Sequence, residues 1–237
     1  MTASRSVLIT GGNRGIGAAI AAAFVANGDK VAVTHRGASD LPDGVLGVQA
    51  DVTDPESLDR AFTEVEAAHG PVEVLIANAG ITNDQLLLRM SEKDFTDVID
   101  VNLTGVFRSV KRAIKGMIRA KKGRIVLVSS VSGIYGAAGQ VNYSASKAGL
   151  IGIARSLTRE LASRGITTNV IMPGVVLTEM FDAVSDEVKA KYLADIPAGR
   201  FADATEIANV VRWLSSDEAA YISGALIPVD GGASMGH

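Results

Sequence analysis

Tyr143 and Lys147 are the pair of residues with the clearest capacity for chemistry. They stand four residues apart in a stretch with helical periodicity, residues 143–164, so their side chains rise from one face of a helix. A tyrosine with an ordinary pKa of about 10 is a poor proton donor or acceptor near neutrality. A neighbouring ammonium group stabilises the phenolate and lowers that pKa, which would suit the tyrosine to proton transfer at a carbonyl group. Taken alone, this spacing is also typical of a partly exposed helix face.

A glycine-rich segment lies near the start of the chain. Residues 10–17 have the sequence TGGNRGIG and stand between a short apolar run and an alanine-rich helical stretch. Glycines permit a tight turn and let backbone amides approach a pyrophosphate, while the helix N-terminus adds free N–H groups and partial positive charge. This position after the first expected strand predicts a dinucleotide site rather than an ordinary turn.

The end of the second apolar run indicates which dinucleotide is bound. Arg36 stands 19 residues beyond Gly17, where a carboxylate would bind the ribose hydroxyls of NAD. Arg36, together with Arg14 from the glycine-rich segment, instead suits a 2′-phosphate. We therefore expect NADPH/NADP+ as the cofactor. Two alternatives stay open: Arg36 is a solvated surface residue, or Asp40 binds the ribose.

These residues need a scaffold, and the apolar pattern predicts one. Short, fully apolar runs are typical of strands covered on both faces, and their alternation with helical stretches predicts a parallel sheet. We expect an α/β fold, a Rossmann-type doubly wound seven-stranded parallel sheet with helices on both faces, in a single domain over residues 1–237. The expected strands are 6–10, 31–35, 45–49, 73–77, 124–129, 167–172 and 225–229, and the expected helices are 15–27, 55–68, 92–119, 143–164, 185–194 and 205–215.

Composition excludes several other classes of protein. The 237 residues carry 23 basic and 26 acidic side chains, a net charge of −3 that does not favour nucleic-acid binding. The chain has no cysteine and three scattered histidines, so we expect no metal site. No apolar run is long enough for a membrane span, and the N-terminus lacks the pattern of a signal peptide. These features predict a cytoplasmic protein without a membrane or nucleic-acid partner.

The glycine spacing, Asn78-Ala79-Gly80 and Tyr143-x-x-x-Lys147 together resemble the classical short-chain dehydrogenase/reductase family along the whole chain. The resemblance implies that Tyr143 exchanges the proton, Ser130 binds the substrate carbonyl, Lys147 binds the nicotinamide ribose and Asn102 holds a proton-relay water. Ser129 and Ser132 compete with Ser130 for the serine role. The expected cofactor-binding residues are Gly11, Asn13, Arg14, Gly15, Ile16, Gly17, Arg36, Asp51, Val52, Asn78, Gly80, Tyr143, Lys147, Val176 and Thr178.

Other segments indicate the substrate. Residues 102–105, 196–200, 221–224 and 229–232 resemble 3-oxoacyl-[acyl-carrier-protein] reductases of fatty acid synthesis, and residues 34–36 and 235–237 resemble their actinobacterial branch in mycolic-acid synthesis. The resemblance implies NADPH-dependent reduction of a 3-oxoacyl thioester bound to acyl carrier protein or CoA. Alternatives are a reductase of a sugar, steroid or xenobiotic ketone, and a dinucleotide sensor without chemistry. The irregular, partly apolar stretch 173–200 is interpreted as a lid.

A basic block between Asp100 and Glu160 holds eleven cations and no acidic residue. Arg108, Lys111, Arg112, Lys115 and Arg119 fall on one helical stripe, with Lys121, Lys122 and Arg124 just beyond it. We expect this 108–124 face either to dock an acidic carrier protein or to be a solvated helix face. The family resemblance also implies a homotetramer.

Overall fold

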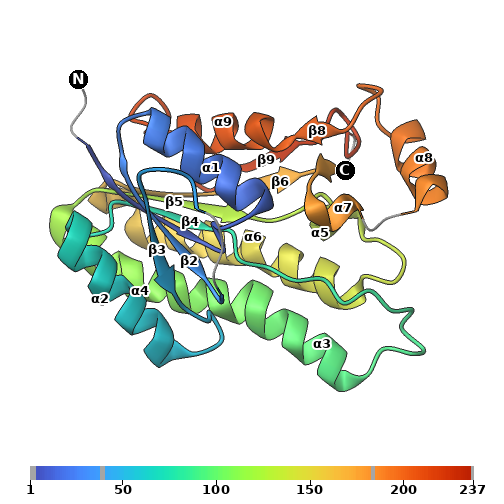
Figure 1. The fold of residues 1–237 in the computed structure, drawn as a ribbon, viewed down its shortest axis with the longest axis horizontal. Coiled ribbons are helices and arrows are strands. Elements are labelled where there is room, and N and C mark those ends of the chain that lie inside the picture. Colours follow the sequence, from blue (N-terminus) through green and yellow to red (C-terminus); the bar gives the residue numbers. More distant parts are fainter. Residues whose placement is uncertain (1–3, 38–40, 183–184, 236–237) are drawn as a thin grey trace.

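Seven parallel strands form the centre of the protein. The structure is a computed structural model that describes residues 4–37, 41–182 and 185–235. Every strand pairs in parallel with its neighbours (Figure 1). Across the sheet the strands run in the order β3 (Val45–Gln49), β2 (Lys30–His35), β1 (Ser6–Thr10), β4 (Val74–Ala77), β5 (Gly123–Val128), β6 (Ile166–Pro173) and β9 (Leu226–Val229).

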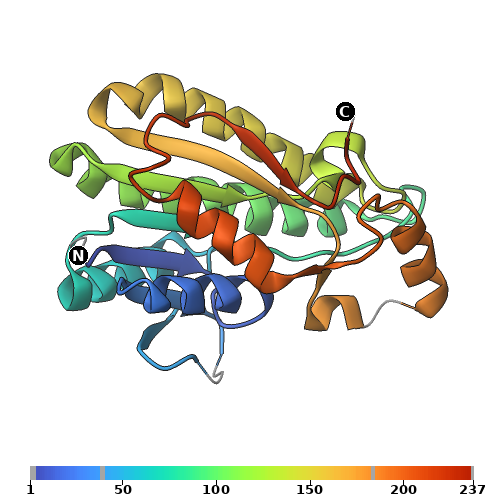
Figure 2. The same ribbon diagram turned by 90° about the horizontal axis from the view of Figure 1, so that it is seen from above.

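Helices cover both faces of this sheet, as Figures 1 and 2 show. Consecutive residues of β1 serve different faces: Val7 and Ile9 join the cluster under α1 (Gly15–Ala26) and α9 (Ala204–Leu214), while Leu8 joins the opposite cluster. That second cluster lies under three further helices, α2 (Pro55–His69), α4 (Gly105–Ala120) and α6 (Val141–Leu161). All five β1 side chains are buried, which explains why the run is apolar rather than alternating. The expected doubly wound fold is confirmed.

The expected helix over 92–119 is divided in the structure. It consists of α3 (Glu92–Ile99), a π-helical turn η1 (Asp100–Thr104) and α4. Apolar periodicity did not reveal the turn, because one wide turn hardly disturbs a 28-residue helical pattern (92 to 119, inclusive). Asn102, one of the expected catalytic residues, lies inside this turn.

The segment interpreted as a lid has its own secondary structure. It includes β7 (Val176–Leu177), which pairs with β8 (Ala202–Asp203) in a small sheet, and the helices α7 (Glu179–Asp182) and α8 (Asp186–Ala194). The rings of Phe181 and Phe201 meet edge to face at 4.8 Å. This small sheet was not expected from the sequence, nor were the short helices α5 (Ser132–Tyr135) and η2 (Ala162–Arg164).

Membrane-spanning helices and metal sites are both absent from the described ranges. No helix there is long and apolar enough to cross a bilayer. Across the same ranges, no group of three or more His, Cys, Asp or Glu side chains is arranged to hold a metal ion.

Candidate active site

The strand order changes direction between β1 and β4, whose carboxyl ends lie side by side. On one side of β1 lie β2 and β3, and on its other side lie β4, β5, β6 and β9. Ligands of open α/β sheets bind at such a switch point. The side chain of Asn78, directly after β4, donates to the carbonyl groups of Thr10 at 3.1 Å and Gly11 at 2.9 Å. The Thr10 hydroxyl in turn accepts from the backbone N–H groups of Asn78 and Ala79. Asn78 therefore joins the glycine-rich loop to the next strand.

The glycine-rich loop is packed too closely for side chains. A Cβ on Gly17 would collide with the Gly11 carbonyl oxygen and lie 2.7 Å from the Asn78 amide nitrogen. Gly15 has a φ of +52°, and a Cβ there would lie 3.5 Å from the Thr178 side chain. This contact places the expected residue Thr178 beside the loop. In the described part of the chain no side chain caps the N-terminus of α1 at Arg14, so its amides remain available to a pyrophosphate.

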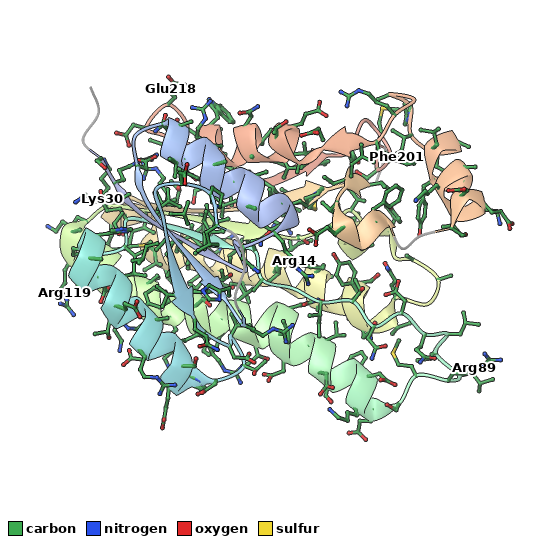
Figure 3. The ribbon with its side chains drawn as sticks, in the orientation of Figure 1. Arg14, Lys30, Arg89, Arg119, Phe201 and Glu218 are labelled. Carbon is green, nitrogen blue, oxygen red and sulfur yellow. The ribbon has the colours of Figure 1, made fainter. Side chains whose placement is uncertain are left out.

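Two arginines lie exposed around the same edge of the sheet. Arg14 precedes α1 and Arg36 follows β2; Figure 3 shows Arg14 at the N-terminal end of α1. The hydrogen bond from the Thr53 backbone, with one from its hydroxyl, holds the pKa of Asp51 below its usual value, and the charge of Arg36 acts in the same direction. Arg36 thus lies near Asp51, as expected for one nucleotide site. Asp40, the alternative ribose ligand, lies outside the described residues, as do residues 236–237 of the resembling C-terminal segment.

The expected cofactor residues are not all equally placed to touch a ligand. Asn13 and Ile16 lie half-buried in the glycine-rich loop and at the start of α1. Val52 is 7% exposed and packs where Gly105 begins α4, and Val176, also 7% exposed, packs in the core cluster under α1 and α9. The side chains of Val52 and Val176 are thus occupied by packing, so we expect any contact of these two with the cofactor to come mainly from the backbone.

The catalytic residues expected from the sequence come together beside this loop. Ser130 lies close enough to the Tyr143 phenol to lower its pKa, and the Lys147 ammonium nitrogen lies 5.5 Å from the centroid of the Tyr143 ring. Lys147 is buried and donates to the Val128 carbonyl group, at the end of β5, at 2.8 Å. The chain thus anchors the ammonium group at the carboxyl edge of the sheet, below the tyrosine.

Burial changes the acidity of both groups. It lowers the pKa of Lys147 to about 8 and raises the pKa of Tyr143 to about 12. The Ser130 hydrogen bond lowers the pKa of Tyr143, and the charge of Asp84 raises it further. In the protein alone, desolvation of the phenolate outweighs the contribution of Ser130 and keeps the pKa of Tyr143 above 10. That Lys147 lowers this pKa together with a bound, positively charged nicotinamide stays a prediction. Tyr143 holds its proton at neutral pH, as a proton donor must.

The three candidate serines have distinct positions. The Ser129 hydroxyl is buried and donates to the Lys147 carbonyl group at 2.9 Å. Ser132 donates to the Ser130 oxygen from both its hydroxyl, at 3.0 Å, and its backbone N–H, at 3.3 Å. Because the Ser130 oxygen accepts these bonds, its own proton remains free to be donated to another group. The geometry favours Ser130 for contact with a substrate and gives Ser132 a supporting position that the sequence did not indicate.

Asn102 is completely buried, and its amide is fully engaged as a donor. It donates to the Ile81 carbonyl at 2.9 Å and to the Ser146 hydroxyl at 3.1 Å, and its oxygen accepts from the Ile81 N–H at 2.8 Å. A Cβ on Gly80 would lie 3.3 Å from the Asn102 oxygen and 3.4 Å from the Lys147 nitrogen. The Asn102 side chain therefore positions the π-helical turn and α6, and Gly80 leaves space beside Lys147.

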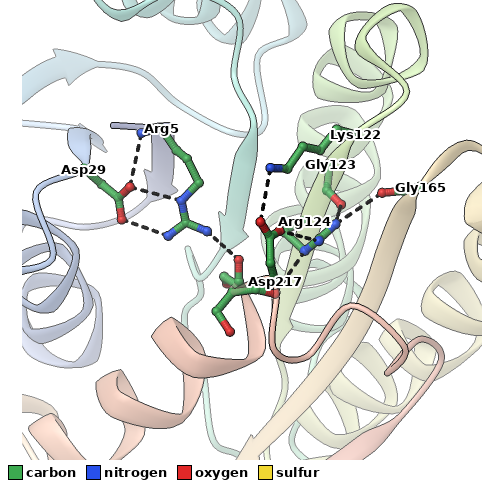
Figure 4. Close-up of polar contacts among 9 residues, drawn as sticks. Arg5, Asp29, Lys122, Gly123, Arg124, Gly165 and Asp217 are labelled. Atoms are coloured by element: carbon green, nitrogen blue, oxygen red, sulfur yellow. Dashed lines mark hydrogen bonds and ion pairs between the residues drawn. The ribbon is translucent and has the colours of Figure 1, made fainter. Parts of the chain in front are cut away.

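The basic 108–124 face is partly neutralised. Arg108 pairs with Asp100, and Arg112 pairs with Asp59 and Glu66 from α2. Figure 4 shows Lys122 and Arg124 both paired with Asp217. Lys121 and Lys122 also immediately precede β5, whereas Ser130 follows the other end of that strand. The structure therefore places this end of the face at the edge of the sheet opposite the candidate active site.

The fold and the site together define a nucleotide-dependent oxidoreductase of Rossmann type. The family model for enoyl-(acyl carrier protein) reductase matches residues 11–234. The 3-oxoacyl-[acyl-carrier-protein] reductase MabA of Mycobacterium avium is 56% identical over 234 residues, covering 99% of this chain and 91% of that protein. The 3-oxoacyl-[acyl-carrier-protein] reductase FabG of Escherichia coli (strain K12) is 47% identical over 235 residues, covering 96% of each chain. This protein belongs to the short-chain dehydrogenase/reductase family, and its cofactor is a nicotinamide dinucleotide.

Proposed function

We propose that this protein is an NADPH-dependent 3-oxoacyl-thioester reductase of fatty acid synthesis or elongation. The observation that carries the reaction type is the grouping of Ser130 and Lys147 around the phenol of Tyr143: Ser130 acts on its pKa, and the Lys147 ammonium nitrogen, bonded to the Val128 carbonyl, lies 5.5 Å from the ring centroid. The substrate class is supported by the names of MabA and FabG, which share 56% and 47% identity with the chain. Catalytic roles for Ser130, Tyr143 and Lys147 and a positioning role for Asn102, expected from the sequence as a catalytic residue, are part of this proposal.

The proposed mechanism assigns the proton transfer to Tyr143. The nicotinamide cofactor, when bound, supplies a hydride to the carbonyl carbon of the substrate. Tyr143 donates the phenolic proton to the carbonyl oxygen, which becomes the hydroxyl of the product, and Ser130 polarises that oxygen by hydrogen bonding. The Lys147 ammonium group stabilises the phenolate left on Tyr143. Asn102 holds α6 in place through Ser146.

NADPH is preferred over NADH in this proposal. Arg14 and Arg36 are exposed near the same nucleotide edge, and neither has an acidic partner within 4.0 Å among the described residues. Two guanidinium groups suit a 2′-phosphate and gain nothing from the ribose hydroxyl of NADH. The uncapped start of α1 and the tight glycine loop supply backbone N–H donors for the pyrophosphate of the cofactor.

The test is a steady-state assay with acetoacetyl-CoA, followed by 3-oxoacyl-CoA substrates of increasing length, with NADPH and with NADH. We expect oxidation of NADPH with the thioesters and little turnover of small sugar or steroid ketones. Turnover of the ketones but not the thioesters would favour the alternative reductase. Tight NADPH binding without any turnover would favour the sensor.

A second assay separates carbonyl reduction from enoyl reduction, the activity in the description of the matching family model. Crotonyl-CoA carries a carbon–carbon double bond in place of the 3-oxo group. Ser130 and Tyr143 are arranged to bind and protonate an oxygen, so we expect acetoacetyl-CoA to be reduced and crotonyl-CoA to be inert. Reduction of crotonyl-CoA alone would contradict the proposal.

A homotetramer and a cytoplasmic location belong to the same proposal. Phe107 on α4 is 51% exposed and Val141 on α6 is 41% exposed, which supports burial of these helices against other subunits. Sedimentation analysis tests the tetramer, for which a monomer at micromolar concentration is the contrary result. Fractionation of cells tests the location.

A further inference from the structure

Arg108 on α4 joins two segments that are far apart in the sequence. One nitrogen of its guanidinium group, Nη1, donates to the Asp100 carboxylate at 2.8 Å and to the Val52 carbonyl at 3.3 Å. The Arg108 side chain is 23% exposed, whereas its neighbour Lys111 is exposed to solvent. Arg108 therefore faces these two segments and is turned away from the outer surface of the basic 108–124 face.

The two partners of Arg108 belong to different parts of the candidate active site. Val52 follows β3 at the carboxyl edge of the sheet and is one of the residues expected to contact the cofactor through the backbone. Asp100 is the first residue of the π-helical turn η1, which contains Asn102. Because α3, η1 and α4 follow one another along the chain (Figure 1), Arg108 reaches back across the turn that precedes its own helix.

The first residue of α4 packs against the same nucleotide segment. A Cβ on Gly105 would lie 2.8 Å from the Val52 side chain and 3.3 Å from the Val52 carbonyl oxygen. This carbonyl is also the group that accepts from Arg108. The helix thus approaches Val52 so closely that a shift of the π-helical turn would also shift the Val52 peptide group.

Asn102 extends the connection to the catalytic residues. Its side chain forms two hydrogen bonds with the backbone of Ile81 and donates to Ser146, next to Lys147. The ion pair of Asp100 with Arg108 spans the turn that contains Asn102. A π-helical turn is an uncommon conformation, so contacts that span it are expected to hold it in place.

We propose that Arg108 is a positioning residue: by bonding both Val52 and Asp100, it links the nucleotide site to the turn that holds Asn102. Nucleotide bound at Val52 stabilises the hydrogen-bonded pair of Asn102 and Ile81, and by reciprocity this pair favours nucleotide binding. The inference rests on the proposed contact of Val52 with the cofactor. It does not require that the substrate be a 3-oxoacyl thioester.

Four variants separate the contacts of Arg108. Arg108→Met removes both bonds and keeps an unbranched apolar side chain, while Asp100→Ala removes the ion pair and leaves the bond to Val52. Arg108→Lys keeps a charge for Asp100 and is the conservative rescue. Arg112→Met is the matched control, because Arg112 lies one turn later on α4, is 20% exposed and pairs with two carboxylates of α2 instead.

The first measurement is the dissociation constant of NADPH and of NADH, by calorimetry. We expect Arg108→Met to raise both constants about 3- to 10-fold, because Val52 loses a charge-assisted hydrogen bond. Both nucleotides are affected equally, since Arg108 acts through the Val52 backbone and not on the 2′-phosphate. Asp100→Ala should have a smaller effect, and Arg108→Lys should restore most of the affinity. Arg112→Met should lower the melting temperature and leave both constants unchanged.

The second measurement is hydrogen exchange of the Ile81 amide, whose N–H donates to the Asn102 oxygen. In the nucleotide-free protein, Arg108→Met and Asp100→Ala should each accelerate this exchange about 3- to 10-fold, because the turn opens more often. Arg112→Met should not accelerate it. NADP+ should slow the exchange in the wild type, and should slow it less in Arg108→Met.

An effect of Arg108→Met on only one of the two measurements, or on neither, would overturn the inference. Equal effects of Arg112→Met would also overturn it, because they would indicate general destabilisation. A weaker affinity for NADPH alone would indicate direct contact of Arg108 with the 2′-phosphate instead. Neither measurement uses a substrate, so failure of this inference is distinguishable from failure of the proposed reductase activity.

Discussion

Asn102 and Ile81 form a closed pair of hydrogen bonds: the asparagine oxygen accepts from the Ile81 N–H at 2.8 Å, and its amide donates to the Ile81 carbonyl at 2.9 Å. A side chain thereby pairs with a backbone as a neighbouring strand would. Asn102 can reach Ile81 from the π-helical turn, and it also bonds Ser146, next to Lys147. Through this pair, one buried amide connects the segment after β4 with the helix that carries Tyr143.

Replacing Asn102 should therefore cost stability as well as activity. Asn102→Ala leaves the Ile81 backbone groups without partners, and we expect a loss of about 2–4 kcal/mol in the free energy of unfolding. Chemical denaturation measures it. Asn27→Ala is the control, because Asn27 is exposed and, among the residues that the structure describes, its side chain donates only to Asp29; a loss as large as that of Asn102→Ala would contradict this interpretation.

We expect Lys147 to be required for activity but to lower the stability of the folded protein. Burial lowers the pKa of Lys147 to about 8, so holding its charge in the folded state is unfavourable at neutral pH. We expect Lys147→Met to be inactive and about 1–2 kcal/mol more stable at pH 7, after allowance for the lost bond to Val128.

The pH dependence of that difference has a definite sign. Between pH 8 and the ordinary lysine value of about 10.5, the unfolded chain binds the Lys147 proton and the folded protein does not, so the wild type gains stability as the pH rises. The advantage of Lys147→Met should therefore shrink over this range. Thermal unfolding at several pH values measures it, and an advantage that grows with pH would refute the argument.

Arg36 should determine the choice of nucleotide. If it binds the 2′-phosphate, Arg36→Leu removes a charge-assisted contact, and we expect KM for NADPH to rise about 10- to 100-fold with KM for NADH nearly unchanged. Arg60→Leu serves as the control, since Arg60 is exposed on α2 and only loosely paired at 3.9–4.0 Å. Equal effects of Arg36→Leu on both nucleotides would exclude the proposed contact.

Two glycine substitutions should have opposite effects. Gly17→Ala places a methyl group against the Gly11 carbonyl and the Asn78 amide, so we expect loss of cofactor binding and a lower melting temperature. Gly116→Ala, in the middle of α4, meets only Pro71 at 3.8 Å and should stabilise the protein by about 0.5–1 kcal/mol. Titration with NADPH and thermal unfolding measure the two effects.

If the basic 108–124 face docks a carrier protein, we expect the contact to be made by the part of α4 nearest the candidate active site. Lys111 lies in the first half of α4 and has no ion pair within 4.0 Å among the described residues, whereas Lys121 and Lys122 lie at the opposite edge of the sheet. We expect Lys111→Glu to raise KM for carrier-bound substrate about 3- to 10-fold and to spare acetoacetyl-CoA. Replacing both Lys121 and Lys122 by Glu should leave KM unchanged for both substrates. If this double variant raises KM for carrier-bound substrate as much as Lys111→Glu does, the whole 108–124 face would be the docking surface.

Much of the fold could be predicted because its signals are local. β1 is buried at every position and apolar at its three central ones, since helices cover both its faces, and the expected bounds 6–10 and 45–49 agree with those of β1 and β3. The lid was harder. β7 has two residues, and only its pairing with β8, some 25 residues later (202 − 177), makes it a strand. A pairing of that kind leaves no periodicity to detect.

The sequence by itself determined the scaffold and the catalytic residue types, because strand burial, glycine turns and the four-residue spacing of Tyr143 and Lys147 are properties of short segments. Only the tertiary structure decided the acidity of those two side chains, the pairing of Arg112 and Arg124 with distant carboxylates, and the π-helical turn at Asn102. Burial and charge depend on groups that come together from remote parts of the chain, so they cannot be determined from the spacing of residues in one segment.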